Sequence, residues 1–181
     1  IGDWSSDVCS SDLVNNGVSN KKIQIIEPFA YNYNFKLLQR NDNQIRLVYS
    51  GTLRDEENIL EMIEEFQKIH KERPEVVLKI VYGKIHGNHE FTHKVKKYIT
   101  QGVKGIIFKH NLTHKDSCYE IATSDIGICW RKNGYGDNGE VSTKVKEYEM
   151  YGLLLIDNLN IRYNNIYVVK HTIAEIGRAH V

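Results

Sequence analysis

Hydrophobic positions along residues 45–157 follow two alternating patterns. Short, mainly apolar runs predict strands that are buried on both faces of a sheet; they cover residues 45–49, 76–82, 105–108, 126–129 and 153–156. The segments between them place apolar residues every three or four positions, which predicts amphipathic helices; these cover residues 55–73, 89–101, 113–123 and 143–151. Strands and helices therefore alternate along the chain.

Residues with helix-ending or helix-starting chemistry support these boundaries. Asp55 and Thr113 precede two of the helices and can accept hydrogen bonds from first-turn amides. Pro74 stops the first helix, while Gly102 and Gly152 follow the ends of two others. The alternation predicts an α/β fold, a doubly wound parallel sheet of the Rossmann-like kind with helices on both faces. Ligands of such sheets bind at the carboxyl ends of the strands, so we expect the functional site there.

The two ends of the chain are related at the level of codons. Residues 176–181 can be encoded by ATC GGA AGA GCA CAC GTC, whose reverse complement translates as residues 7–12. Chance rarely produces such a match, whereas a translated sequencing-library adapter on both sides of an insert does. We therefore expect residues 1–13 and 176–181 to be adapter-like artefacts and the rest to be a fragment cut at both ends. A genuine tail at each end is the alternative.

The remaining chain divides into two parts. Residues 14–44 are polar and rich in asparagine, apart from one apolar island at residues 23–29. We expect a linker there that contains a short strand. The roughly 160 residues of 14–175 suit a single domain, so residues 45–175 are expected to form one Rossmann-like domain, truncated at its C-terminal end.

Composition and charge exclude few function classes. The formal net charge is +1, which gives no argument for a nucleic-acid partner. No apolar run approaches the roughly 18 residues that a membrane-spanning helix needs. Cys118 and Cys129 lie in apolar segments, so we expect both to be reduced core residues of a cytosolic protein.

The richest candidate chemistry lies in residues 139–156, where a polar, glycine-rich loop leads into a helix and then into an apolar strand. Ser142 or Thr143 can cap that helix with a side-chain oxygen. The free amides and the positive end of the helix dipole suit a phosphate. Lys144 adds a positive charge in the first turn, and Glu147, one turn later, can accept two sugar hydroxyls.

This stretch resembles the nucleotide-sugar site of group 1 (family 4) glycosyltransferases of the GT-B fold. The resemblance spans roughly residues 23–157 and depends on the order of several short motifs: Ser50-Gly51-Thr52-Leu53, Thr123-Ser124-Asp125-Ile126, and Ser142-Thr143-Lys144-x-x-Glu147-Tyr148-x-x-x-Gly152. It implies that Glu147 binds the ribose of the donor nucleotide. It also implies that the preceding loop and the start of the helix hold the diphosphate.

Several positions depart from the family pattern. The family has Gly-Arg-Leu, followed by a lysine, to grip the donor diphosphate, and this chain has Thr52 at the arginine position and Glu57 at the lysine position. Two positive charges are therefore missing, and Arg131, Lys132 or Lys144 could compensate. The family's first glutamate falls on Gly139, and we keep the neighbouring Glu140 as a candidate donor contact beside a role as a solvated carboxylate.

The resemblance implies the donor-binding half of a GT-B fold. The expected donor-binding residues are Gly51, Thr52, Glu140, Ser142, Thr143, Lys144 and Glu147. The parent enzyme is then a hexosyl- or other glycosyltransferase of glycan biosynthesis that transfers sugar from a nucleotide diphosphate sugar to an acceptor. A missing N-terminal domain would hold that acceptor, so no catalytic residue is assigned and the fragment itself is expected to be inactive.

The resemblance also bears on cofactors and location. GT-B enzymes generally need no bound metal, so we expect no cofactor and no metal site. We expect no nucleic-acid partner. The parent would be cytoplasmic, and it could associate peripherally with the inner face of a membrane to reach a glycan or lipid acceptor.

A zinc metalloprotease is one alternative, because His89-Glu90-Phe91-Thr92-His93 is a literal His-Glu-x-x-His sequence. At about 100° per residue, however, His89 and His93 fall opposite the apolar face of their helix and should point into water. His110 and His114 are expected to be loop and cap residues.

Two further alternatives remain. A nicotinamide-binding Rossmann domain needs a Gly-x-Gly-x-x-Gly turn after a strand, and neither the turn at Gly51 nor the pair Gly134 and Gly136 has that spacing. A degenerate or purely binding nucleotide module is the other, and Thr52 and Glu57 favour it.

Overall fold

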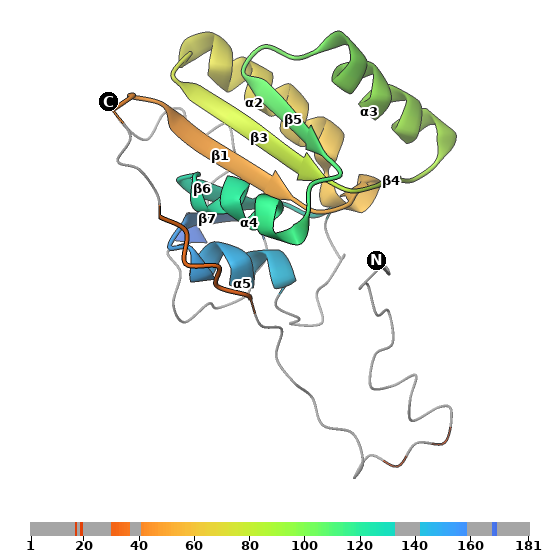
Figure 1. The fold of residues 1–181 in the computed structure, drawn as a ribbon. Helices are drawn as coiled ribbons and strands as arrows, with labels where there is room; N and C mark the ends of the chain where they lie inside the picture. The colour runs from red at the N-terminus through yellow and green to blue at the C-terminus, as the bar shows by residue number, and fades with distance from the viewer. Residues whose placement is uncertain are drawn as a thin grey trace.

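The computed structural model describes residues 17, 19, 30–36, 41–132, 142–158 and 168–169. Its centre is a parallel sheet in the order β5-β3-β1-β6-β7-β8, with every neighbouring pair parallel (Figure 1). The strands are β1 (Ile45–Ser50), β3 (Val76–Tyr82), β5 (Ile106–His110), β6 (Ile126–Cys129), β7 (Leu154–Asp157) and β8 (Val168–Val169). The order reverses at β1, so the sheet is doubly wound as the strand–helix alternation predicted.

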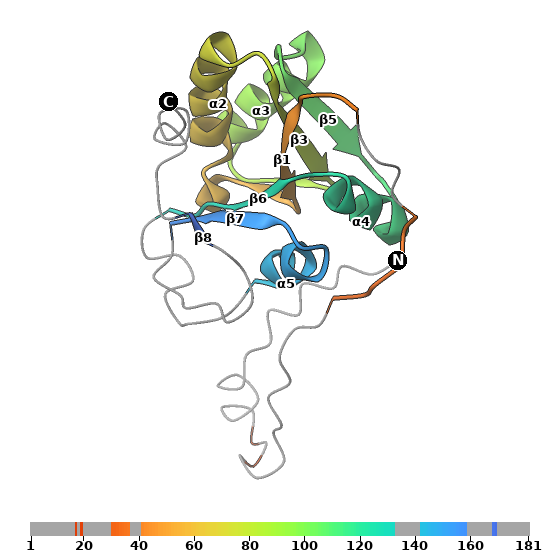
Figure 2. The ribbon, with the colours of Figure 1, turned by 90° about the vertical axis from the view of Figure 1, so that its left-hand side faces the viewer.

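Among the described residues, helices cover both faces of the sheet (Figure 2): α2 (Ile59–Glu72) and α3 (His89–Gln101) pack on one face, and α4 (His114–Ala122) and α5 (Thr143–Met150) on the other. Leu47 and Tyr49 of β1 point into the core beneath α2 and α3, whereas Val48 between them joins the core beneath α4 and α5. Because successive strand residues point to opposite faces, both faces of β1 are buried, and Leu47–Tyr49 are apolar without a break.

Helix starts agree with the predictions in part. The Thr113 hydroxyl accepts a hydrogen bond from the amide of Asp116 and caps α4 as expected. Ser142 stands at the N-cap of α5, but its side chain makes no capping bond. Gly152 follows α5 with a φ of +71°, the left-handed conformation that a helix-terminating glycine provides.

The prediction that Asp55 caps the first long helix was wrong. Asp55–Glu57 form a short 3₁₀ helix (η2), and α2 begins only after Asn58, whose φ of +49° interrupts the helical path. The break turns Glu57 inward, where it is buried. Two short strands, β2 (Leu53–Arg54) and β4 (Ile85–His86), pair parallel beside this turn, and two residues are too few to show a period in sequence.

Other predictions about the chain fall outside the described residues. They concern the adapter-like ends at 1–13 and 176–181 and the short strand at 23–29. Within the described part of the linker, residues 30–36 lie against α4, where the rings of Phe35 and Tyr119 meet edge to face with centroids 5.4 Å apart. Cys118 and Cys129 are buried and free, as predicted. None of the helices that the structure describes is long and apolar enough to span a bilayer.

Candidate functional site

The start of α5 and the turn after β1 meet at the carboxyl edge of the sheet. A Cβ atom added to Gly51 would lie 2.5 Å from Cε of Lys144, so a larger residue here would have to displace the lysine side chain that crosses this turn. Gly51 also has a φ of +147°. The hydroxyl of Tyr49 donates to the carbonyl of Thr52 at 2.7 Å and holds the turn in place. The structure therefore brings Gly51, Thr52 and Lys144 together, as the sequence predicted.

Glu57 organises the cations at this edge. Its carboxylate accepts a hydrogen bond from Nζ of Lys144 at 2.7 Å and lies 3.8 Å from Nε of Arg131. The side chains of Glu57 and Lys144 are only 8% and 14% exposed. Nζ of Lys144 also lies 4.7 Å from the centroid of the Tyr49 ring, a cation–π geometry. Glu57 thus holds two cations in a buried network.

A second ion pair lies beside this network. Nζ of Lys132 contacts the carboxylate of Asp55, and its backbone amide donates to the carbonyl of Glu56 at 2.8 Å. Arg131, Lys132 and Lys144 were the candidates to replace the missing positive charges. All three lie at this edge, each against an acidic side chain of the 3₁₀ turn.

Glu147 lies one turn further along α5, in a mostly enclosed position. Its side chain is 20% exposed, and its Oε1 lies 3.3 Å from Nε2 of His114. Burial raises the pKa of the Glu147 carboxyl, and the neighbouring His114 and Lys144 act in the opposite direction. His114 is the first residue of α4 rather than its cap. Its proximity to Glu147 was not predicted, because 33 residues separate the two.

Tyr148 anchors α5 to the sheet. Its hydroxyl accepts a hydrogen bond from the amide of Ser50 at 3.1 Å and donates to the carbonyl of Ile128 at 3.3 Å. Its ring lies on Gly127, where a Cβ atom would come within 2.3 Å of the ring. The ends of β1 and β6 therefore fix the rotation of α5, and that rotation directs Lys144 and Glu147 over the edge of the sheet.

The remaining predicted site residues differ in their exposure, and one of them lies outside the described residues. Ser142 is partly buried at the start of α5, and Thr143 is exposed as its first residue. Amides in the first turn of a helix have no partner within it, so this end can receive an anion. Glu140 lies outside the described residues.

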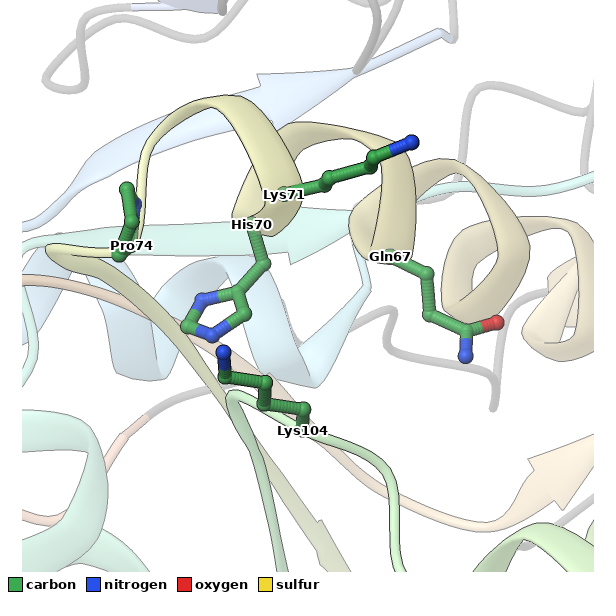
Figure 3. A pocket seen from close by; sticks show the side chains of 5 residues that line it. All are labelled: Gln67, His70, Lys71, Pro74 and Lys104. Atoms are coloured by element: carbon green, nitrogen blue, oxygen red, sulfur yellow. The ribbon is translucent and has the colours of Figure 1, made fainter.

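A hollow elsewhere in the molecule does not belong to this edge. It measures about 210 Å³ and is lined by Gln67, His70, Lys71, Pro74 and Lys104 (Figure 3). These residues lie near the amino ends of β3 and β5, opposite the edge where α5 begins. Nδ1 of His70 lies at hydrogen-bonding distance, 2.8 Å, from the carbonyl oxygen of Val76. The imidazole therefore has a structural role at this position.

The His-Glu-x-x-His sequence lies on the outside of α3. His89 and His93 are exposed with ring centroids 6.2 Å apart, as the angular argument predicted. Glu90 forms an ion pair with Lys94 at 2.7 Å on the same helix. The carboxylate of Glu90, the general base of the protease hypothesis, is therefore paired with Lys94 and not directed at a metal held by the two histidines. The arrangement gives the protease hypothesis no support.

Comparison with known proteins identifies the fold. The C-terminal domain of a group 1 family glycosyltransferase (LpcC) from Francisella tularensis has a TM-score of 0.52 and 19% identity over 74% of this chain and 72% of that domain. HepE from Anabaena, solved with UDP-glucose, has a TM-score of 0.55 and 13% identity over 75% of this chain and 38% of that one. A UDP-forming α,α-trehalose-phosphate synthase from Burkholderia xenovorans has a TM-score of 0.51 and 11% identity, covering 75% and 35%.

The fold is therefore that of the C-terminal domain of GT-B glycosyltransferases, which confirms the predicted fold class. This chain spans little more than a third of HepE and of the synthase. No protein-family model matches the sequence, and the comparison with curated proteins gives no match.

Proposed function

We propose that this chain binds a nucleotide diphosphate sugar at the carboxyl edge of its sheet and is the donor-binding half of a glycosyltransferase. The observation that carries the proposal is the convergence of Gly51, Lys144 and Glu147 at one edge. The likeness to the C-terminal domain of a group 1 glycosyltransferase and to HepE, whose structure holds UDP-glucose, supports the same ligand class.

Each group has a defined part in this proposal. The diphosphate lies against the first-turn amides of α5 and Nζ of Lys144, and the Glu147 carboxylate accepts hydrogen bonds from the two ribose hydroxyls. These groups are positioned before the ligand arrives, so they stabilise the charge that gathers on the departing diphosphate without reorganising. Holding the nucleoside in one register adds an orientation effect. The acceptor and any acceptor-side base belong to the part of the parent enzyme outside this chain.

The buried Glu57 network favours a second candidate, a nucleotide-binding module without transferase activity. The carboxylate of Glu57 lies 2.7 Å from Nζ of Lys144, so a bound diphosphate must share that lysine with a negative charge. Both candidates require nucleotide binding, and they differ in turnover. A parent protein that binds the donor but releases no nucleoside diphosphate in the presence of glycan and lipid acceptors would favour the binding module.

Isothermal titration calorimetry on the 181-residue chain tests the site with UDP, GDP, ADP and UDP-glucose, in EDTA. Replacing Lys144 or Glu147 with alanine should weaken binding by about 10- to 100-fold, because each change removes a charge-assisted hydrogen bond worth about 1.5–3 kcal/mol. Lys146→Ala and Glu149→Ala are the matched controls. They lie on the same helix, and Glu149 has the same 20% side-chain exposure as Glu147.

Two outcomes of the titration would contradict the proposal. Equal affinity for nucleotide in Lys144→Ala, Glu147→Ala and the two control variants, with all four folded by circular dichroism, would remove the site assignment. If the unsubstituted 181-residue chain binds no nucleotide, the proposed function is refuted.

A further inference from the structure

Three metal-binding side chains converge where α4 meets α5. They are His114 and Cys118 of α4 and Glu147 of α5, and their ligand atoms all lie within 4.8 Å of one another. His114 and Cys118 are four residues apart on a helix, so they lie on the same face one turn apart. Glu147 approaches that face from the neighbouring helix. We propose that these three residues form a binding site for a zinc-class transition-metal ion.

The distances fit a tetrahedral ion. Bond lengths of about 2.3 Å to sulfur and 2.0–2.2 Å to nitrogen and oxygen put neighbouring ligand atoms about 3.4–3.6 Å apart in a tetrahedral site. Here Nε2 of His114 lies 3.8 Å from Sγ of Cys118 and 3.3 Å from Oε1 of Glu147. The third pair, Sγ of Cys118 and the Glu147 carboxylate, lies within 4.8 Å, so the side chains need to close by up to about 1.3 Å to coordinate one ion.

The imidazole of His114 is oriented by a partner outside the triad. The hydroxyl of Tyr33 lies 2.9 Å from Nδ1 of His114, and the two rings are tilted with centroids 5.7 Å apart. A hydrogen bond from Nδ1–H to that hydroxyl leaves Nε2 as the basic nitrogen, and Nε2 is the atom that faces both other ligands. Metal-bound histidines generally have such a second partner, which fixes the ring and its tautomer.

Ligand type and charge point to the zinc class. A thiolate and an imidazole select zinc or cobalt over magnesium and calcium, which prefer oxygen ligands. Binding releases the thiol proton of Cys118 to solvent, after which the thiolate and the Glu147 carboxylate together neutralise a divalent ion. His114 is 56% exposed at its side chain while Cys118 is fully buried. The ion thus has a route from solvent, and water can take the fourth position, as in open zinc sites.

Cobalt spectroscopy tests this inference without any nucleotide. The EDTA-treated 181-residue chain, in a phosphine reductant and free of oxygen, is titrated with Co²⁺. A thiolate-to-cobalt charge-transfer band should reach its plateau at one equivalent and disappear when Zn²⁺ is added. Cys118→Ser should abolish the band, while Cys9→Ser and Cys129→Ser, which alter the other two cysteines of the chain, should retain it.

The exposed histidine supplies a second test that does not depend on the buried thiol. His114→Ala should weaken Co²⁺ binding by at least 10-fold, and Tyr33→Phe should weaken it by about 10-fold through loss of the orienting contact. No charge-transfer band at one equivalent, a band that survives in Cys118→Ser, or unchanged affinity in His114→Ala would each overturn the proposal. Because the titration contains no nucleotide, its failure leaves the proposed donor site intact, and the reverse also holds.

Discussion

Glu57→Gln tests most directly whether a bound diphosphate lies against Lys144 at this edge of the sheet. The substitution keeps the shape of the side chain and a hydrogen-bond acceptor for Lys144, and it removes one negative charge from the buried network. In the proposed complex Nζ of Lys144 lies between Glu57, at 2.7 Å, and the diphosphate. The loss of the carboxylate should therefore make nucleotide binding stronger, in contrast to most substitutions in a binding site.

The size of the effect follows from the geometry. With Lys144 between them, the Glu57 carboxylate and the nearest phosphate oxygen are about 5–6 Å apart, and their repulsion at an effective dielectric constant near 20 is about 3 kcal/mol. Solvent at the edge of the sheet screens part of this energy in the complex. We expect a gain of about 1–2 kcal/mol, or roughly 5- to 30-fold tighter binding of UDP or another nucleoside diphosphate.

The stability of the free protein should change in the opposite direction. Removing one partner of a buried ion pair leaves the other charge uncompensated, which costs up to about 3–5 kcal/mol. The glutamine still accepts a hydrogen bond from Lys144, so the loss should be smaller. The melting temperature without ligand should fall, and the rise in melting temperature upon nucleotide addition should increase.

Calorimetry and thermal unfolding measure both effects on the same samples. Glu56→Gln is the matched control, because Glu56 lies next to Glu57 in η2 and is exposed; it should change neither quantity. If a folded Glu57→Gln variant binds nucleotide as weakly as the parent, or more weakly, the diphosphate does not lie against Lys144 and the site must be elsewhere.

Four further predictions concern the core and the two sites. Gly127→Ala should destabilise the protein by about 1–3 kcal/mol in urea unfolding, because the added Cβ would lie 2.3 Å from the Tyr148 ring; an unchanged midpoint would contradict this packing. Tyr148→Phe should cost about 1–3 kcal/mol in the same measurement, because it leaves the buried amide of Ser50 without its acceptor. Burial lowers the pKa of Lys79, so below its usual pKa the folded protein binds fewer protons at this site than the unfolded chain. Stability relative to Lys79→Met should therefore increase as the pH rises toward the usual pKa of lysine, as measured by urea titrations, and a difference that does not change with pH would contradict this effect of burial. If both proposals hold, Zn²⁺ and nucleotide compete for Glu147, so saturating Zn²⁺ should weaken nucleotide binding in calorimetry, and equal affinity with and without Zn²⁺ would exclude a shared carboxylate.

Three elements have the bounds that the sequence predicted. The predicted bounds of β3 and β6 coincide with the observed Val76–Tyr82 and Ile126–Cys129, and α3 occupies the predicted His89–Gln101. Each of these segments carries its own local signal: the two strands are mainly apolar runs, and the helix has apolar residues at helical spacing. The turn at Asp55–Glu57 was missed, because an acidic residue before an apolar segment predicts an N-cap whether or not Asn58 interrupts the path.

The candidate site shows the same division. Sequence order alone predicts that the turn at Gly51 and the start of α5 meet at one edge, since parallel strands place their carboxyl ends together. The four-residue spacing of His114 and Cys118 can also be read from the sequence. These inferences depend only on period and topology.

Contacts between distant residues were decided by the tertiary structure. Lys144 is 87 residues from Glu57, and Glu147 is 33 residues from His114. Their meeting depends on the rotation of α5, which the buried Tyr148 sets through the ends of β1 and β6. A sequence pattern indicates which face of a helix is buried, but a rotation of a few tens of degrees, fixed by packing, determines which charges that helix brings together.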